Sequence, residues 1–495
     1  MESIIKTIST PTFFTVNNSY PIQTDISLDV EPNEIIGVTA TALHQSVECS
    51  KGSVKVGVRV LFTVLYGSDK VLVYESGVDY NFEQRDEKIE PNSLYKQNCI
   101  CDDAKILVND DGSLTVSTVI EFSATFCVTN QLSFLQDVDG AEVKTEQKKV
   151  VSMQKCLQPV TATFDGEKQL NFEIERVLCH SDSVRVLQTE SGIGEIIVDG
   201  EILSEFSLLT VAGEVVNTSM LTAFRYEIEC DGVSVDNLSF ANACMQNANF
   251  KISFLNDENS SKVTGEYQIV FNAVVLSENT VSCVIDGFST THELLLSYEN
   301  LIFDNAFSFS SYKHKCFGEG ICELEKGERV ICALSGRVDI LQATKQEKLA
   351  NTKIEGIVNL SLLTQLGESK KIKSAKVAFD FNLDSDLQLS DLSATVKNIV
   401  VRSLEQKCII DCEVVFSALF KNSESSNMAC HAEEGEARTV TQSAISVLFI
   451  SKGDDLWTVC KKALASEKNI LADNPDITFP ATSDKAIVVY KRLGE

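Results

Sequence analysis

The sequence predicts a mainly-β protein in which three antiparallel β-sandwich-like domains in tandem precede a small α+β domain. Three observations carry this prediction: the length, a threefold internal repeat, and a change of pattern near the C-terminus. The chain has 495 residues, which is too many for one hydrophobic core and suggests about three or four domains of ~100–200 residues each. The predicted domains span residues 1–150, 151–295, 296–435 and 444–495.

The first repeated landmark is a long strand in which apolar and polar residues alternate. It occurs as LTVSTVIEFSATF, VTGEYQIVFNAVV and CIIDCEVVFSALF, and aligning Phe122, Phe271 and Phe416 gives separations of 149 and 145 residues. A period of two places one face of a strand in a core and the other in water, as in an antiparallel sheet. We therefore expect the three Phe residues to occupy equivalent core positions.

Two further landmarks keep the same order in every repeat. One is a strand with a glycine, and the glycines that we align are Gly57, Gly200 and Gly356. The other is a strand with two aromatics one residue apart, in the motifs YNFE, FRYE and FDFN, which begin at Tyr80, Phe224 and Phe379. Three landmarks at near-constant spacing indicate one β module of about seven strands copied three times.

The segments between these landmarks are interpreted as turns and linkers. NDDG, which begins at Asn109, is predicted as a hairpin turn, and NDENSS, which begins at Asn256, as a loop. Residues 140–155 are interpreted as the linker between the first two modules, and residues 297–307 as the start of the third. Residues 421–443 are polar and acidic, and we expect them to be a strand-poor tether. The three modules are expected to give the molecule its length.

After residue 443 the pattern becomes strand, helix, helix, strand. Asp454 or Asp455 can cap the first helix by accepting hydrogen bonds from backbone N–H groups, and Ser466 can cap the second. The second helix is expected to turn Ile470 and Leu471 inward. We call this predicted unit, residues 444–495, the knob.

The charge balance excludes two classes of partner. Lys and Arg total 43 against 71 Asp and Glu, which gives a formal net charge of −28. Such a chain repels phosphate backbones and anionic lipid surfaces, so neither a nucleic-acid partner nor membrane insertion is expected. No window approaches the ~18 apolar residues of a membrane span. The first residues lack the apolar stretch of a signal peptide, so we expect the protein to stay in the cytoplasm.

The sequence offers little catalytic chemistry. It has no nucleophile elbow, phosphate loop or dinucleotide-binding motif, so no catalytic residue and no cofactor is predicted. The best metal candidate is the set His314, Cys316, Cys322 and Cys332. Its spacing is irregular, whereas structural zinc usually takes closely paired cysteines, and buried or loop thiols are the alternative interpretation. The 16 Cys are expected to be reduced, with exposed thiols able to cross-link in oxidising surroundings.

The segment GDDLWTVCKKALASEKNILADNP resembles a LysM module, whose signature joins Gly-Asp-Thr-Leu and an aromatic residue to a later Asn-Pro. Asp455 stands where LysM modules usually have Thr, and FPATSDKA replaces the usual Pro-Gly-Gln. The resemblance implies a ligand groove between two loops. It gives the candidate site Gly453, Asp454, Asp455, Leu456, Trp457, Asn474 and Pro475.

The repeats resemble SPOCS domains, which occur in spore-coat-associated proteins. The stretch VKVGVRVLFTVLYGSDKVLVYESGVDYNFE carries this resemblance, with Leu65 and Tyr66 at the turn. Tandem SPOCS repeats followed by a LysM module are the layout of a family of spore-coat morphogenetic proteins of endospore-forming Firmicutes. In that family the chain is made in the mother cell and concentrates at the forespore surface. Its LysM module binds the coat-basement ATPase.

Two functions follow from these resemblances. The leading hypothesis is a non-enzymatic scaffold of the spore coat whose knob docks a coat-morphogenetic protein, with the coat-basement ATPase as the expected partner. The alternative is a protein that binds peptidoglycan or another N-acetylglucosamine polymer at the cortex or cell wall. Trp457 is interpreted either as knob core or as part of a partner surface, near Lys461 and Lys462, which could meet an acidic partner. Sheet edges of the repeats could also pair with a second copy in self-assembly.

Overall fold

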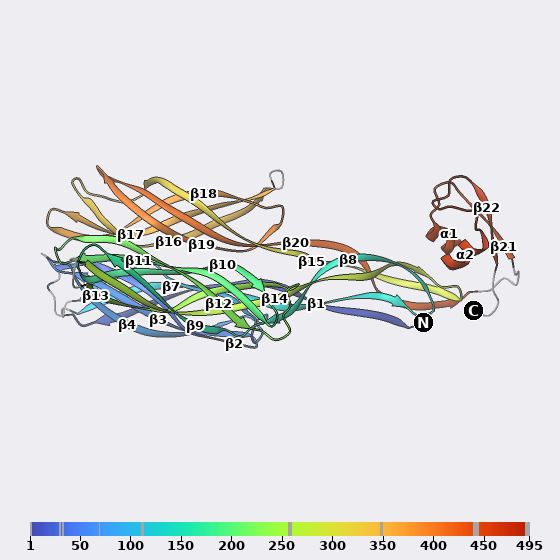
Figure 1. The fold of residues 1–495 in the computed structure, drawn as a ribbon, viewed down its shortest axis with the longest axis horizontal. Coiled ribbons are helices and arrows are strands. Elements are labelled where there is room, and N and C mark those ends of the chain that lie inside the picture. Colours follow the sequence, from blue (N-terminus) through green and yellow to red (C-terminus); the bar gives the residue numbers. More distant parts are fainter. Residues whose placement is uncertain are drawn as a thin grey trace.

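The computed structural model describes residues 2–28, 31, 34–68, 70–109, 113–255, 260–346, 350–438 and 445–490. Its elements are strands β1–β22 and two short helices, which confirms the mainly-β fold class. Figure 1 shows three parts along the long axis: a broad body of sandwiches, a narrow stalk, and the knob beside the far end of the stalk.

The first sandwich contains β1–β7, and all its strand pairs are antiparallel. One sheet has the order β1-β7-β5, with β6 also paired to β7, and the other has the order β2-β3-β4. The bounds are β1 (Ser3–Ile26), β2 (Ile35–Ser50), β3 (Ser53–Tyr66), β4 (Leu72–Arg85), β5 (Leu94–Cys101), β6 (Lys105–Val108) and β7 (Leu114–Val138). β6 and β7 flank the NDDG segment and pair with each other, although three of its four residues lie outside the described part.

The second and third sandwiches repeat this arrangement. Their sheets have the orders β13-β14-β8 (with β9 on β14), β10-β11-β12, β15-β20-β19 and β16-β17-β18. The NDENSS loop lies mostly outside the described residues. The second sandwich contains β8 (Glu142–Cys156), β9 (Val160–Leu170), β10 (Ile174–Ser191), β11 (Glu195–Thr210), β12 (Val215–Glu229), β13 (Leu238–Leu255) and β14 (Ser260–Phe288). The third contains β15 (His292–Gly320), β16 (Arg329–Gln346), β17 (Asn351–Leu366), β18 (Ser369–Asp384), β19 (Gln388–Leu404) and β20 (Lys407–Ala437).

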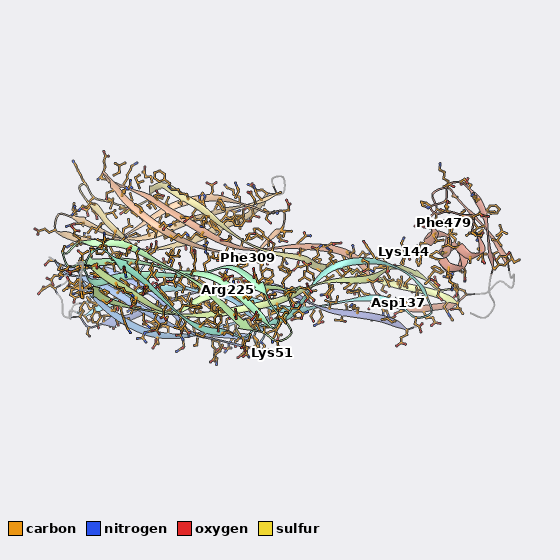
Figure 2. All side chains as sticks on the ribbon, viewed as in Figure 1. Lys51, Asp137, Lys144, Arg225, Phe309 and Phe479 are labelled. Atoms are coloured by element: carbon orange, nitrogen blue, oxygen red, sulfur yellow. The ribbon has the colours of Figure 1, made fainter. Side chains whose placement is uncertain are left out.

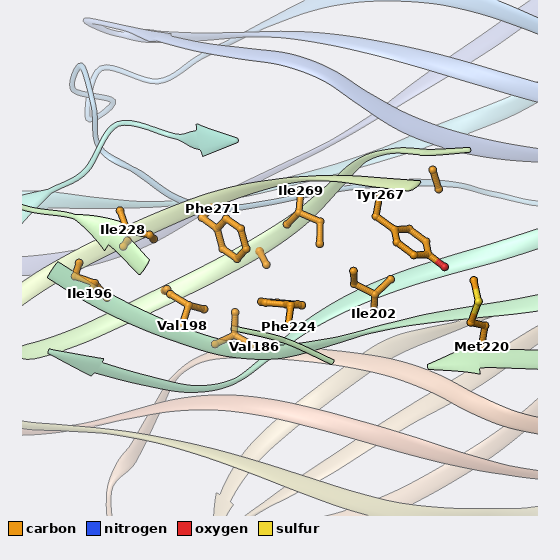
Figure 3. Packing of buried hydrophobic residues seen from close by; sticks show 14 of the residues in the cluster. Val186, Ile196, Val198, Ile202, Met220, Phe224, Ile228, Tyr267, Ile269 and Phe271 are labelled. Atoms are coloured by element: carbon orange, nitrogen blue, oxygen red, sulfur yellow. The ribbon is translucent and has the colours of Figure 1, made fainter. Parts of the chain in front are cut away.

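The aligned Phe residues occupy equivalent core positions, as expected. Phe122, Phe271 and Phe416 are only 2%, 1% and 0% exposed. Each meets the second aromatic of its module's aromatic motif, which comes from the opposite sheet. The ring centroids of these pairs, Phe82–Phe122, Tyr226–Phe271 and Phe381–Phe416, are 5.4, 5.1 and 5.3 Å apart. Aromatic pairs at such distances add to the free energy gained by burying their area. Figure 3 shows Phe271 among the buried side chains of the second sandwich.

The alignment of Gly57 with the other two glycines is wrong by one residue. Gly200 lies opposite Phe224 and Gly356 opposite Phe379, where an added Cβ would come within 2.2 and 2.5 Å of the facing ring. In the first module the residue opposite Tyr80 is Val58, whose side chain is buried in the core. At Gly57 an added Cβ would instead come within 2.7 Å of the hydroxyl of Ser46.

The three sandwiches lie side by side rather than end to end (Figure 1). All three contribute to one apolar cluster between them, with Leu65, Leu209 and Leu363 on equivalent strands β3, β11 and β17. An ion pair of 2.7 Å between Lys96 and Asp391 also joins the first and third modules. The modules therefore do not give the molecule its length.

The length comes from the stalk, where three strand pairs continue beyond the sandwiches. β1 pairs with β7, β8 with β14, and β15 with β20. All six strands contribute to one buried cluster, which contains Ile8, Leu132, Phe134, Val150, Val281, Cys283, Phe303 and Met428. Figure 2 labels Asp137 and Lys144 on this stalk.

The linker interpretations are therefore wrong. Most of residues 140–155 belongs to β8, residues 297–307 lie inside β15, and β20 continues to Ala437, while residues 439–444 lie outside the described part. These strands look polar because their buried residues form short runs, such as Phe134-Leu135 and Met428-Ala429, between exposed polar residues. The domain boundaries drawn after residues 150 and 295 fall inside β8 and β15.

The knob consists of β21 (Ile445–Ile450), α1 (Leu456–Ala463), α2 (Glu467–Asp473) and β22 (Lys485–Tyr490). β21 and β22 pair antiparallel in a two-stranded sheet. Both helices pack on this sheet around the buried residues Val459, Cys460, Ile470 and Ile487. Among the described residues, no helix is long and apolar enough to span a membrane.

We expect Phe271→Ala to lower the free energy of unfolding of the second sandwich by about 3–5 kcal/mol, because it removes a fully buried ring and leaves a cavity. Urea denaturation followed by far-UV circular dichroism measures this loss. Phe254→Ala is the matched control, since Phe254 lies on β13 of the same sandwich but is 59% exposed. Equal effects of the two substitutions would contradict the assignment of Phe271 to the core.

Candidate docking site

Two backbone hydrogen bonds join the loop before α1 to the segment before β22. Gly453 has φ 95°, a left-handed conformation that favours glycine. Its N–H donates to the carbonyl of Ala481 at 2.8 Å, and the N–H of Ala481 donates to the carbonyl of Asp454 at 2.9 Å. Gly453 therefore shapes the loop.

The two aspartates of the motif hold the same loop. Asp455 is the N-cap of α1, since its carboxylate accepts from the N–H of Thr458 at 2.7 Å. The Asp454 carboxylate accepts from the N–H of Ser451 at 3.1 Å and pairs with Lys462 at 3.0 Å. These contacts lower the pKa of both carboxyls. The largest cause is the hydrogen bond with Ser451 for Asp454 and the hydrogen bond with Thr458 for Asp455. Of the two predicted caps, Asp455 is the one that the structure uses.

Asn474 joins the end of α2 to β22. Its side-chain NH2 donates to the carbonyls of Ile470 at 2.9 Å and Val488 at 2.7 Å, and its carbonyl oxygen accepts from the N–H of Val488 at 2.9 Å. Pro475 follows at the surface, just after the helix. The Asn-Pro end of the motif is thus a structural connection within the knob.

Trp457 is part of the knob core, one of the two roles that the sequence left open, and its part in a partner surface stays a prediction. Its ring belongs to the knob core and is 9% exposed, while its indole N–H donates to Asp286 of the stalk at 2.8 Å. Leu456 is partly buried against the same core. Of the two residues expected to point inward from α2, Ile470 is fully buried, but Leu471 is 43% exposed.

Most polar groups of the LysM-like motif are therefore engaged within the chain. The carboxylates of Asp454 and Asp455, the side-chain amide of Asn474 and the indole of Trp457 all have protein partners. Hydrogen-bond groups that already have partners gain little from a ligand. The seven candidate residues build the fold of the knob, and the structure does not gather them into a lining of free polar groups.

Sequence reasoning missed an apolar strip on the knob, which we define as Ile445, Val447 and Phe449. These residues alternate along β21, so they share one face, and they are 53%, 59% and 79% exposed. β21 pairs only with β22, which leaves its other edge open among the described residues. In the sequence, ISVLFI reads as a continuous apolar run, which hides the exposed alternation.

The knob also differs from the rest of the chain in charge. Residues 445–495 contain seven Lys or Arg and seven Asp or Glu, so their formal net charge is zero. The net charge of −28 therefore comes entirely from residues 1–444. A neutral module with an exposed apolar strip meets less electrostatic repulsion from another acidic protein than the body does.

The metal candidate does not form one set of ligands. Cys316 lies opposite Cys412 on paired strands, and Cys332 is buried with Leu334 between the modules. His314 lies beside Phe381, with 5.0 Å between ring centroids. Among the described residues no three His, Cys, Asp or Glu side chains are grouped to hold a metal ion. The cysteines are buried or half-buried, and cross-linking in oxidising surroundings stays a prediction.

A cavity of about 340 Å³ lies between the modules and is lined by all three of them. Gln97 Oε1, Asp182 Oδ1 and Arg337 Nε in its lining are buried without a hydrogen-bond partner in the described structure. Burial raises the pKa of Cys244, which also lines the cavity, to about 12. This thiol is therefore protonated at neutral pH and is a poor nucleophile.

Comparison of the chain with protein-family models, with curated proteins and with solved structures gives no significant match in any of the three.

We expect the stability of the knob to fall as the pH drops below about 4. Each carboxyl whose pKa is lower in the folded state than its ordinary value of 3.8 stabilises the fold above that value and loses its contribution as the pH falls through the folded pKa. Asp455→Ala removes the cap and should cost about 1 kcal/mol at pH 7 and less at pH 3.

The single Trp of the chain makes this measurement specific, because urea denaturation followed by Trp457 fluorescence reports on the knob and its contact with the stalk. Thr482→Ala, at an exposed position of the same module, is the control. An Asp455→Ala effect that is the same at both pH values would contradict the role of this carboxylate.

Proposed function

We propose that this protein is a non-enzymatic scaffold of the endospore coat whose knob docks a coat-morphogenetic protein. The expected partner is the coat-basement ATPase, and the expected route is from the mother-cell cytoplasm to the forespore surface. This proposal rests on the SPOCS-like repeats and the LysM-like motif, and on a molecule in which a separate small module lies beside the end of a long stalk (Figure 1).

The observation that carries the docking role is the apolar strip of the knob. Large exposed hydrophobic side chains that share one face are typical of protein interaction sites. Phe449 is the most exposed of the three at 79%, and an aromatic ring of this kind is a common anchor of protein interfaces. The open edge of β21 could add backbone hydrogen bonds to a strand of the partner.

The body supports a structural role. Its modules share buried contacts and its stalk has a continuous core, so it can hold the knob at a distance from the sandwiches. The acidic surface favours solubility until the partner is reached. Buried thiols and dispersed histidines in the described structure favour a scaffold over a catalyst.

We expect Phe449→Asp and Val447→Asp, singly and together, to reduce binding of the purified ATPase at least tenfold, because each places a charge on the apolar strip. Surface plasmon resonance with the full chain measures the loss. Leu471→Asp is the matched control, since Leu471 is an exposed apolar residue on α2. Unchanged binding by the double variant, with a native far-UV spectrum, would rule out the strip as the docking surface.

The glycan alternative gives a different outcome. Because the motif's polar groups have partners within the chain, we expect purified peptidoglycan to leave the full chain in the supernatant after sedimentation. A LysM protein with known peptidoglycan binding is the positive control. Saturable co-sedimentation that Asp454→Ala abolishes would favour the alternative.

A further inference from the structure

The knob binds a short extended segment of its own stalk. Trp457 Nε1 donates to Asp286 Oδ2 at 2.8 Å, and Lys461 Nζ contacts both oxygens of the same carboxylate at 2.8 and 2.9 Å. The ring of Phe288 lies 5.4 Å from the ring of Trp457, between centroids. Two residues of α1, one helical turn apart, therefore contact a carboxylate and an aromatic ring of the stalk.

The bound segment has a simple recognition pattern. Asp286 and Phe288 are separated by Gly287 near the end of β14, so their side chains share one face of an extended strand. Phe288 is 3% exposed and belongs to the buried cluster of the knob, together with Val459 and Ile470. The pattern is an acidic residue, any residue and an aromatic residue.

The contact is small and combines one buried ring, that of Phe288, with charged and polar groups. Besides Asp286 and Phe288, the stalk contributes Lys144, which lies opposite Asp286 on β8 and 3.8 Å from the carboxylate of Asp455. Internal hydrogen bonds hold together the two strands, the two helices and the loop of the knob. Small contacts between parts of one chain resemble transient protein–protein interfaces, and the connection between the parts raises their effective concentration.

We propose that the Trp457–Lys461 face of α1 is a recognition site for an extended protein segment with the pattern acid–x–aromatic, and that residues 286–288 occupy it until a partner segment replaces them. This inference rests on the proposed docking function, because it names the chemistry of the partner. Lys461 supplies the cation for the partner's carboxylate, and Trp457 supplies both a hydrogen-bond donor and a ring for the partner's aromatic side chain.

The site can be tested with the full chain and a peptide that copies residues 283–290, with Cys283→Ser to avoid oxidation. Asp286→Lys in the chain should vacate the site, because it places a cation against Lys461. The peptide should then shift Trp457 emission saturably and bind this variant at least tenfold more tightly than the wild-type chain, in which residues 286–288 compete.

The controls isolate the two side chains of the pattern. Peptides with Asp286→Asn or Phe288→Ala should bind at least tenfold more weakly to the Asp286→Lys chain. The double variant Asp286→Lys with Lys461→Glu should lose peptide binding, because its reversed ion pair restores the internal contact. Asp139→Asn, on the exposed turn between β7 and β8, should behave as wild type.

Several outcomes of the peptide experiment would overturn the proposal. They are no saturable shift with the Asp286→Lys chain, equal binding of the altered peptides, or equal peptide affinity of the wild-type chain. Dimers in an equimolar mixture of Asp286→Lys and Lys461→Glu chains, without peptide binding, would also overturn it in favour of a second copy as the occupant. This experiment uses no partner protein. If the peptide does not bind, the docking function is still tested separately by the Phe449 variants.

Discussion

The architecture depends on strands that each belong to two cores, with at least one such strand in every module. β7, β14 and β20 begin inside a sandwich, where Phe122, Phe271 and Phe416 are buried, and continue into the stalk. Phe134 and Met428 lie farther along β7 and β20 in the shared stalk core. Because one continuous strand connects the two cores in each module, the stalk cannot turn freely against the body. The three modules and the stalk are one mechanical unit.

The knob has the opposite relation to the rest of the chain. Its core is small, and it meets the stalk through Phe288, which packs into this core, and through the polar contacts of Asp286. Partial burial alone would raise the pKa of this carboxyl, but Lys461 and Trp457 lower it overall, which keeps the contact charged at neutral pH. A rigid body with a neutral, apolar-faced module held by a small contact suits a protein that places a docking surface at a distance from its bulk.

Local patterns in the sequence predicted the local structure. The period-two strands located Phe122, Phe271 and Phe416 in the cores, and the capping residues Asp455 and Ser466 located the helices of the knob. In each case the pattern arises from residues that are close in sequence, so one sequence suffices to show it. The fold class and the order of elements in the knob followed from these patterns.

The missed features depend on contacts between distant segments. β20 looks polar because Met428 and Ala429 are buried against strands from the other modules, while most of the polar residues around them are exposed. The packing of Leu65, Leu209 and Leu363 around one centre has no local signal. The same holds for the candidate site, where the motif was visible but its use within the chain, and the exposure of Phe449, required the fold.

Hydrogen exchange of the full chain, with and without the purified coat-basement ATPase, tests the docking account most directly. The account requires that binding slow exchange in the backbone of residues 445–490 and leave the sandwich strands unchanged. Slower exchange in the sandwiches with none in the knob would contradict it, because the partner would then be recognised by the repeats.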